Sequence, residues 1–131
     1  MADSRHDLQT VRDLARETPG LELLMLYGSR ARGDDTSRSD WDFGYLAGPN
    51  VDVAGLLGSL VSALGTDRVD LVDLRRAGGL LRFRAARDGD SVFESRPGIA
   101  DRFRLDAAQF WCDVAPVLQR GYADVLAGLT R

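Results

Sequence analysis

The stretch LLMLYGSRARGDDTSRSDWDFGYL, residues 23–46, decides how this chain begins to fold. Its first part belongs to a short apolar run, residues 21–27, which ends at Gly28. The length of the run and the glycine at its end favour a buried strand over a helix. Residues 40–46 then alternate between acidic or small side chains and aromatic ones, which predicts a second strand with an acidic face.

The rest of the chain alternates between helical and strand patterns. Apolar spacing predicts helices over 4–18, 51–64 and 79–87 and strands over 68–74 and 91–95. From residue 98 to 130 an apolar stripe predicts further helix, interrupted at Pro116 because proline lacks the N–H and its ring clashes. Neither repeats nor a linker divide the sequence. We therefore expect residues 1–131 to form one α/β (α+β) domain, with helices flanking a small mixed β-sheet.

Composition limits the classes of function. The chain has 131 residues, of which 44% are hydrophobic and 28% charged, as in ordinary globular proteins. A formal net charge of −3 gives no electrostatic basis for broad nucleic-acid or membrane-surface binding. No apolar run approaches the length of a membrane span, and the N-terminus lacks the apolar core of a signal peptide. We therefore expect a cytoplasmic protein.

Several residues of types that often carry function are interpreted as structural. The single cysteine, Cys112, falls within an apolar helical pattern and is expected to be a packed free thiol. Gly44 interrupts the second strand and predicts either a bulge or the close approach of a ligand. The same reasoning assigns to the hydrophobic core the aromatic residues Trp41, Phe43, Phe110 and Trp111.

The dipeptide Gly28-Ser29 stands where a strand is expected to give way to a helical turn. Glycine permits close backbone approach, and the amides that follow it, with the Ser29 hydroxyl, suit an anion. Arg30 and Arg32 add guanidinium donors that fit phosphate oxygens. A Gly-Ser pair on its own is better explained as a structural turn, because both residues are common in turns.

Acidic residues on the next strands change that balance. Asp40 and Asp42 are two apart, so their side chains leave the same face, where their mutual repulsion is relieved by a divalent cation such as Mg²⁺. The alternative is a solvated edge strand with two surface aspartates. Asp70 and Asp73 are three apart, so only one can join the pair; apolar neighbours favour Asp70, and Asp73 suits an exposed or capping role. Three acids beside a phosphate-binding turn suit two-metal phosphoryl transfer.

The combined pattern resembles a known signature. Gly28-Ser29, ten intervening residues and Asp40-X-Asp42 are similar to the motif of the DNA polymerase beta-like nucleotidyltransferase superfamily. The form GSRARG…SDWD most resembles its minimal nucleotidyltransferases, and the resemblance extends over most of the chain. It implies the polymerase beta-like fold and nucleotidyl transfer, in which an acceptor oxygen attacks the α-phosphate of a nucleoside triphosphate and pyrophosphate leaves.

The resemblance also implies roles for individual residues. The contacts to the β- and γ-phosphates of ATP would come from Gly28 and Ser29, with Arg30 and Arg32 as candidate phosphate contacts. The catalytic carboxylates, which would bind two Mg²⁺ ions, are Asp40, Asp42 and Asp70. Asp70 would also help to deprotonate the attacking hydroxyl.

The resemblance finally implies a partner. Minimal nucleotidyltransferases commonly accompany a HEPN-domain protein, in pairs where the nucleotidyltransferase is an antitoxin that transfers AMP from ATP to a tyrosine of the HEPN toxin. Two alternatives stay open: transfer to a small-molecule or RNA hydroxyl, and a non-catalytic antitoxin that neutralises its partner by binding. The sequence leaves the base preference, the acceptor and the oligomeric state undetermined.

Overall fold

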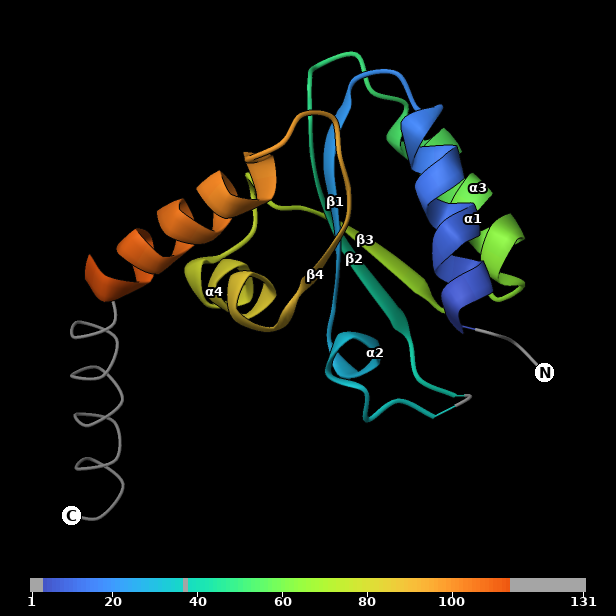
Figure 1. Ribbon diagram of the computed structural model, residues 1–131, viewed down its shortest axis with the longest axis horizontal. Helices are drawn as coiled ribbons and strands as arrows, with labels where there is room; N and C mark the ends of the chain where they lie inside the picture. Colours follow the sequence, from blue (N-terminus) through green and yellow to red (C-terminus); the bar gives the residue numbers. More distant parts are fainter. Residues whose placement is uncertain (1–3, 37, 114–131) are drawn as a thin grey trace, which may run out of the picture.

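A four-stranded mixed sheet lies at the centre of the described part of the chain, residues 4–36 and 38–113 of a computed structural model (Figure 1). The elements are α1 (Ser4–Arg16), β1 (Leu21–Tyr27), α2 (Ser29–Arg32), β2 (Trp41–Ala47), α3 (Val53–Leu64), β3 (Val69–Asp73), α4 (Gly79–Asp88) and β4 (Asp90–Glu94). A further helix begins at residue 99 and continues to residue 113. The predicted break at Pro116 lies outside the described residues.

The strand order is β3-β2-β1-β4. Strand β1 pairs antiparallel with both β2 and β4, whereas β2 pairs parallel with β3. A parallel pair needs a crossover connection, and here the segment between β2 and β3 contains α3. The predicted fold class, a small mixed sheet flanked by helices, is therefore confirmed.

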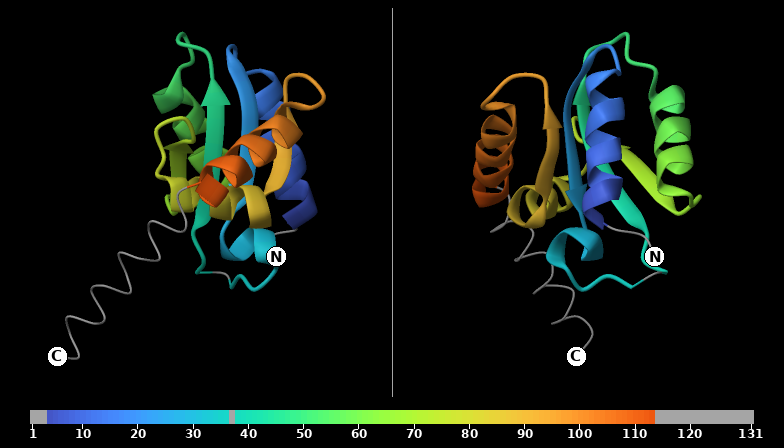
Figure 2. Two further views of the ribbon diagram at one scale, coloured as in Figure 1. Left: turned by 90° about the vertical axis from the view of Figure 1, so that its left-hand side faces the viewer. Right: turned by 45° about the vertical axis from the view of Figure 1, so that its right-hand side comes forward.

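Helices cover both faces of the sheet (Figure 2). Because side chains alternate along a strand, β2 directs Trp41, Phe43 and Tyr45 into the core beneath α1 and α3, as predicted for the first two. A second core on the opposite face joins the sheet to α4 and the helix from residue 99, and includes Leu74 and Phe103. Within residues 4–36 and 38–113, none of the helices combines the length and apolar composition needed to cross a bilayer.

The helix from residue 99 is less buried than its apolar stripe predicts. Phe110 is 44% exposed and Cys112 is exposed, so the prediction that both are packed in the core was wrong. The reason is that this part of the helix packs on α4 and not on the sheet. Phe110 lies where a Cβ on Gly79 would stand, and the Trp111 ring stacks on Phe83 with a centroid distance of 5.1 Å.

Gly44 makes room for a neighbouring side chain. The pairing of β2 continues through this position without a shift, with Gly44 opposite Met25 on one side and Val72 on the other. A Cβ on Gly44 would lie 2.6 Å from Cδ2 of Leu74, which is fully buried. The expectation of a bulge or a close ligand was therefore wrong, since packing of Leu74 accounts for the glycine.

We expect the Gly44→Ala substitution to lower the free energy of unfolding by about 1–3 kcal/mol, the usual cost of overpacking a core. Urea denaturation measures this change. The control is Gly58→Ala in α3, where a Cβ meets no atom within 4 Å and alanine favours the helix by about 0.5–1 kcal/mol. If Gly44→Ala unfolds at the wild-type urea concentration, Leu74 yields freely and the packing explanation fails.

Candidate active site

The Gly28-Ser29 turn joins β1 to the short helix α2. Gly28 has φ +75°, a conformation that L-residues with side chains rarely adopt, and its carbonyl accepts from the amides of Ala31 and Arg32. An oxygen of the Asp42 carboxylate occupies the space that a Cβ on Gly28 would need. Glycine is thus required twice, and the turn is in direct contact with the acidic strand.

The predicted carboxylates lie on neighbouring strands near this turn. Asp42 and Asp70 are direct partners in the parallel pairing of β2 with β3, and Asp40 immediately precedes β2. The pKa of Asp42 is raised, first by burial, then by the charges of Asp70 and Asp40 and by a hydrogen bond with Asp70, while Arg32 opposes the shift. The grouping of these acids therefore costs electrostatic energy in the absence of a cation.

Asp70 and Asp73 separate as their spacing predicts. Asp73 pairs with Tyr45, whose side chain lies in the core beneath α1 and α3, and its carboxylate accepts from the Arg75 amide at 2.9 Å, a capping contact. Asp70 is on the other face with Asp42. Its environment differs from expectation, because β3 is an edge strand and Asp70 is exposed despite its apolar neighbours in sequence.

The carboxylates form an open group. Within the described residues, no three acidic, thiol or imidazole side chains converge closely enough to make a complete ligand set for a metal. Mg²⁺ typically takes one or two carboxylates and completes its coordination with waters and substrate phosphates. An all-oxygen set of mutually repelling carboxylates next to a phosphate-type turn fits that mode of binding.

Tyr27 is a site residue that sequence reasoning missed. It is the last residue of β1, pairs with Asp42 across the antiparallel ladder, and is partly buried. Burial and the charges of Asp42 and Asp70 raise its pKa to about 12. The phenol therefore stays protonated beside the carboxylates and can donate a hydrogen bond. The period-two pattern could have placed Tyr27 on this face, but only the pairing of β1 with β2 places it opposite Asp42.

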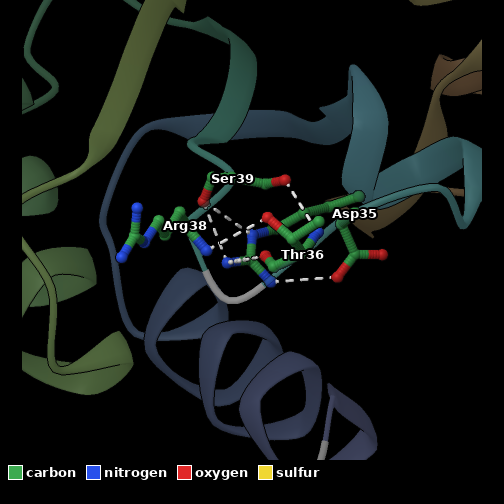
Figure 3. A network of polar contacts seen from close by, with 5 residues as sticks. Asp35, Thr36, Arg38 and Ser39 are labelled. Atoms are coloured by element: carbon green, nitrogen blue, oxygen red, sulfur yellow. Dashed lines mark hydrogen bonds and ion pairs between the residues drawn. The ribbon is translucent and has the colours of Figure 1, made fainter.

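Arg30 holds the loop between the turn and the carboxylates. Its Nε and Nη2 donate to the Ser39 carbonyl at 3.3 and 2.9 Å, and its Nη1 pairs with Asp35 at 3.2 Å. Its guanidinium also lies 4.1 Å from the centre of the Trp41 ring. Figure 3 shows Asp35 on one side of this network and Arg38 on the other, with Ser39 and Thr36 between them. Arg30 therefore fixes the backbone just before Asp40, a different task from the phosphate contact expected for it.

Arg32 faces a hollow next to the turn. It is exposed, makes a 3.4 Å ion pair with Asp34, and lines a pocket of about 640 Å³. The other residues lining it are Tyr27, Gly28, Leu80, Leu81, Arg84, Arg87 and Asp88. A second hollow, of about 590 Å³, is lined by Glu22 and Arg75 near the opposite end of β1. Only the first shares residues with the turn, so it is the candidate binding pocket.

Comparison with known proteins identifies the family. Residues 9–97 match the model of the family described as polymerase beta, nucleotidyltransferase. The chain belongs to this family. The protein adenylyltransferase MntA of Aphanizomenon flos-aquae (strain 2012/KM1/D3) is 30% identical over 104 residues, which cover 70% of this chain and 69% of that protein.

Solved structures agree with this assignment. A chain of a toxin–antitoxin complex with AMP-PNP has a TM-score of 0.77 and 28% identity, covering 91% of this chain and 98% of that one. A chain from the complex of tri-AMPylated Shewanella oneidensis HEPN toxin with MNT antitoxin has a TM-score of 0.74 and 26% identity, covering 95% and 99%. The predicted polymerase beta-like fold and the family resemblance are confirmed.

The raised pKa of Asp42 predicts a pH-dependent effect of Asp42→Asn. Since the folded state disfavours the charged carboxylate, wild-type stability falls as the pH rises from below the unfolded-state pKa through the raised pKa. Asp42→Asn should therefore be more stable than wild type at pH 7 by roughly 1 kcal/mol or less, because solvent screens a partly exposed site. Urea denaturation in EDTA at pH 7 and at pH 3 measures this. An equal difference at the two pH values would contradict the electrostatic cause.

The Arg30 network predicts a local effect of Arg30→Lys. Lysine keeps the charge but lacks the forked donors, so it loses the paired bonds to the Ser39 carbonyl. We expect faster hydrogen exchange at the amides of residues 38–40, measured by mass spectrometry, and a loss of about 1 kcal/mol of stability. Arg38→Lys is the control, because the Arg38 side chain makes no hydrogen bond or ion pair with the described residues. Equal exchange in both variants would show that Arg30 does not hold the loop.

Proposed function

We propose that this chain is a protein adenylyltransferase that transfers AMP from ATP to a hydroxyl, that of a tyrosine, on a HEPN-domain toxin, and so acts as an antitoxin. The observation that carries the proposal is the position of Asp42, which contacts Gly28 in the turn after β1 and pairs with Asp70 on β3. A phosphate-binding turn and two carboxylates thus meet at one point. The names of the related adenylyltransferase and of the HEPN–MNT complex support this choice of nucleotide and acceptor.

The turn would hold and orient the triphosphate. Gly28 admits the Asp42 carboxylate to the turn, and the Ser29 hydroxyl and nearby amides would donate to the phosphate oxygens. Arg32, which is exposed beside the turn and forms an exposed ion pair with Asp34, would exchange that pair for phosphate oxygens. Arg30 contributes by fixing the loop that leads to Asp40.

The reaction is an in-line substitution at the α-phosphorus. The acceptor oxygen forms a bond to the α-phosphorus while the bond from that phosphorus to the bridging oxygen breaks, and pyrophosphate leaves. The proton of the acceptor hydroxyl passes to the Asp70 carboxylate, which is exposed at the sheet edge where a protein acceptor can reach it. The chain supplies positioning and electrostatic stabilisation, and no covalent enzyme intermediate is needed.

Asp40, Asp42 and Asp70 would hold two Mg²⁺ ions. The donor set is made of oxygen atoms alone, as Mg²⁺ prefers, and a cation would relieve the burial and mutual repulsion that raise the pKa of Asp42. When bound, the ions neutralise charge that develops on the phosphate oxygens. We also propose that the activity depends on Mg²⁺ and that the protein is cytoplasmic.

The test is a transfer assay with a HEPN-domain protein as the acceptor, and the first candidate is the product of the neighbouring gene if it carries that domain. With ATP and Mg²⁺, we expect the wild type to add the mass of one or more AMP units to the partner, and Asp42→Asn to reduce the rate by at least about 100-fold. Intact-protein mass spectrometry measures the product. The matched control is Asp73→Asn, which lies on the neighbouring strand β3 and on the opposite face of the sheet from Asp42, and should retain the wild-type rate.

Each outcome of the assay has a defined meaning. If the toxin is active but its mass does not change, protein adenylylation is rejected. The acceptor would then be a small-molecule or RNA hydroxyl. Neutralisation of the toxin that survives the Asp40→Ala, Asp42→Ala double substitution would favour an antitoxin that acts by contact alone. If Asp42→Asn transfers AMP as fast as wild type, the carboxylate site is wrongly assigned.

A further inference from the structure

Helix α4 forms a cationic wall on the pocket that begins at Gly28. Arg84 and Arg87 line this pocket from α4, and Arg32 lines it from α2. Leu80 and Leu81 supply its apolar part. The sequence motif that contains Gly28, Ser29 and the carboxylates does not include α4. The arginines of α4 are more than fifty residues from the turn in sequence.

Asp88 neutralises part of this charge. Nε and Nη2 of Arg87 donate to its two carboxylate oxygens at 3.0 and 2.9 Å, and the Asp88 side chain is 23% exposed. The pKa of Asp88 is lowered chiefly by Arg87, with smaller contributions from Arg32 and Arg84. All three guanidinium groups therefore act on one carboxylate, and they leave the pocket with an excess of positive charge.

Of the three arginines, Arg84 makes the fewest contacts with other side chains of the described residues. Arg32 pairs with Asp34 and Arg87 pairs with Asp88, whereas Arg84 makes no ion pair or side-chain hydrogen bond with the residues that the structure describes. It is also exposed. A multiply charged anion in the pocket would gain the full interaction with Arg84 without first breaking a contact.

The pocket and the carboxylates lie on two sides of the turn. Gly28 contacts Asp42 and also lines the pocket, while none of the three aspartates lines it. If the α-phosphorus lies at the aspartates and the next phosphates pass over Gly28, the end of the triphosphate must reach the pocket. This step depends on the proposed function.

We propose that Arg84 and Arg87, together with Arg32, bind the terminal phosphates of the nucleotide, which are the pyrophosphate that leaves, and that Asp88 limits this binding by its negative charge. Arginine suits the task because its donors match phosphate oxygens in pairs. The limit set by Asp88 favours release of pyrophosphate, since a site with three unopposed arginines would retain this product.

The test compares three ligands on the full-length chain by isothermal titration calorimetry in a buffer with Mg²⁺: inorganic pyrophosphate, AMP-PNP and AMP. We expect Arg84→Gln to weaken pyrophosphate and AMP-PNP about 10-fold, equivalent to one charge-assisted contact, and AMP less than about 2-fold. Asp88→Asn should act in the opposite direction and tighten pyrophosphate several-fold. Arg82→Gln is the control, because Arg82 lies on the same helix but lines the other hollow.

Arg84→Gln and Asp88→Asn are expected to change the affinity for pyrophosphate in opposite directions. Damage to the fold would lower the affinity in both variants, so the two causes can be distinguished. An Arg84→Gln variant that binds pyrophosphate like wild type, or that loses AMP and pyrophosphate equally, would overturn the assignment of Arg84. Weaker pyrophosphate binding in Asp88→Asn would overturn the role of Asp88. Binding of pyrophosphate requires no acceptor. If the variants change pyrophosphate binding as expected but the wild type transfers no AMP to the HEPN protein, the proposed function is rejected and the assignment of Arg84 stands.

Discussion

The repulsion between Asp42, Asp70 and Asp40 is the constraint around which this molecule is organised. The main-chain pairing of β2 with β3 puts Asp42 and Asp70 side by side, and their backbone positions cannot separate without breaking the ladder. The unfavourable energy is offset by apolar packing on both faces of the sheet, where Phe43 and Leu74 are fully buried. Charge is concentrated at one end of a strand whose other residues are almost all core.

Support for the site reaches beyond the strands that carry it. The helix from residue 99 stacks Trp111 on Phe83 and fits Phe110 against Gly79, so it holds α4 in place. Helix α4 in turn forms one wall of the pocket beside Gly28. The aromatic residues near residue 110 thus support the candidate binding pocket through a packed helix.

Sequence reasoning succeeded where the determinants are local. The run ending at Gly28 and the alternation around Asp42 fix strands and faces through period two alone, and the spacing of Asp70 and Asp73 separates them. Prediction from the sequence failed where the burial or contacts of a side chain depend on which helix or loop packs against it. No local pattern shows that Phe110 packs on a half-exposed helix, or that a side chain of Arg30 is used by its own loop.

The parallel pairing of β2 and β3 has a consequence for how such a site can change over time. The separation of Asp42 and Asp70 is set by backbone hydrogen bonds, while the chain between Ala47 and Val69 passes over the opposite face as α3. The length and surface of that excursion therefore have no influence on the carboxylate spacing. The loops on either side of α3 can therefore change in length without altering the distance between the two carboxylates, as long as Leu56 and Leu60 keep α3 packed on the sheet.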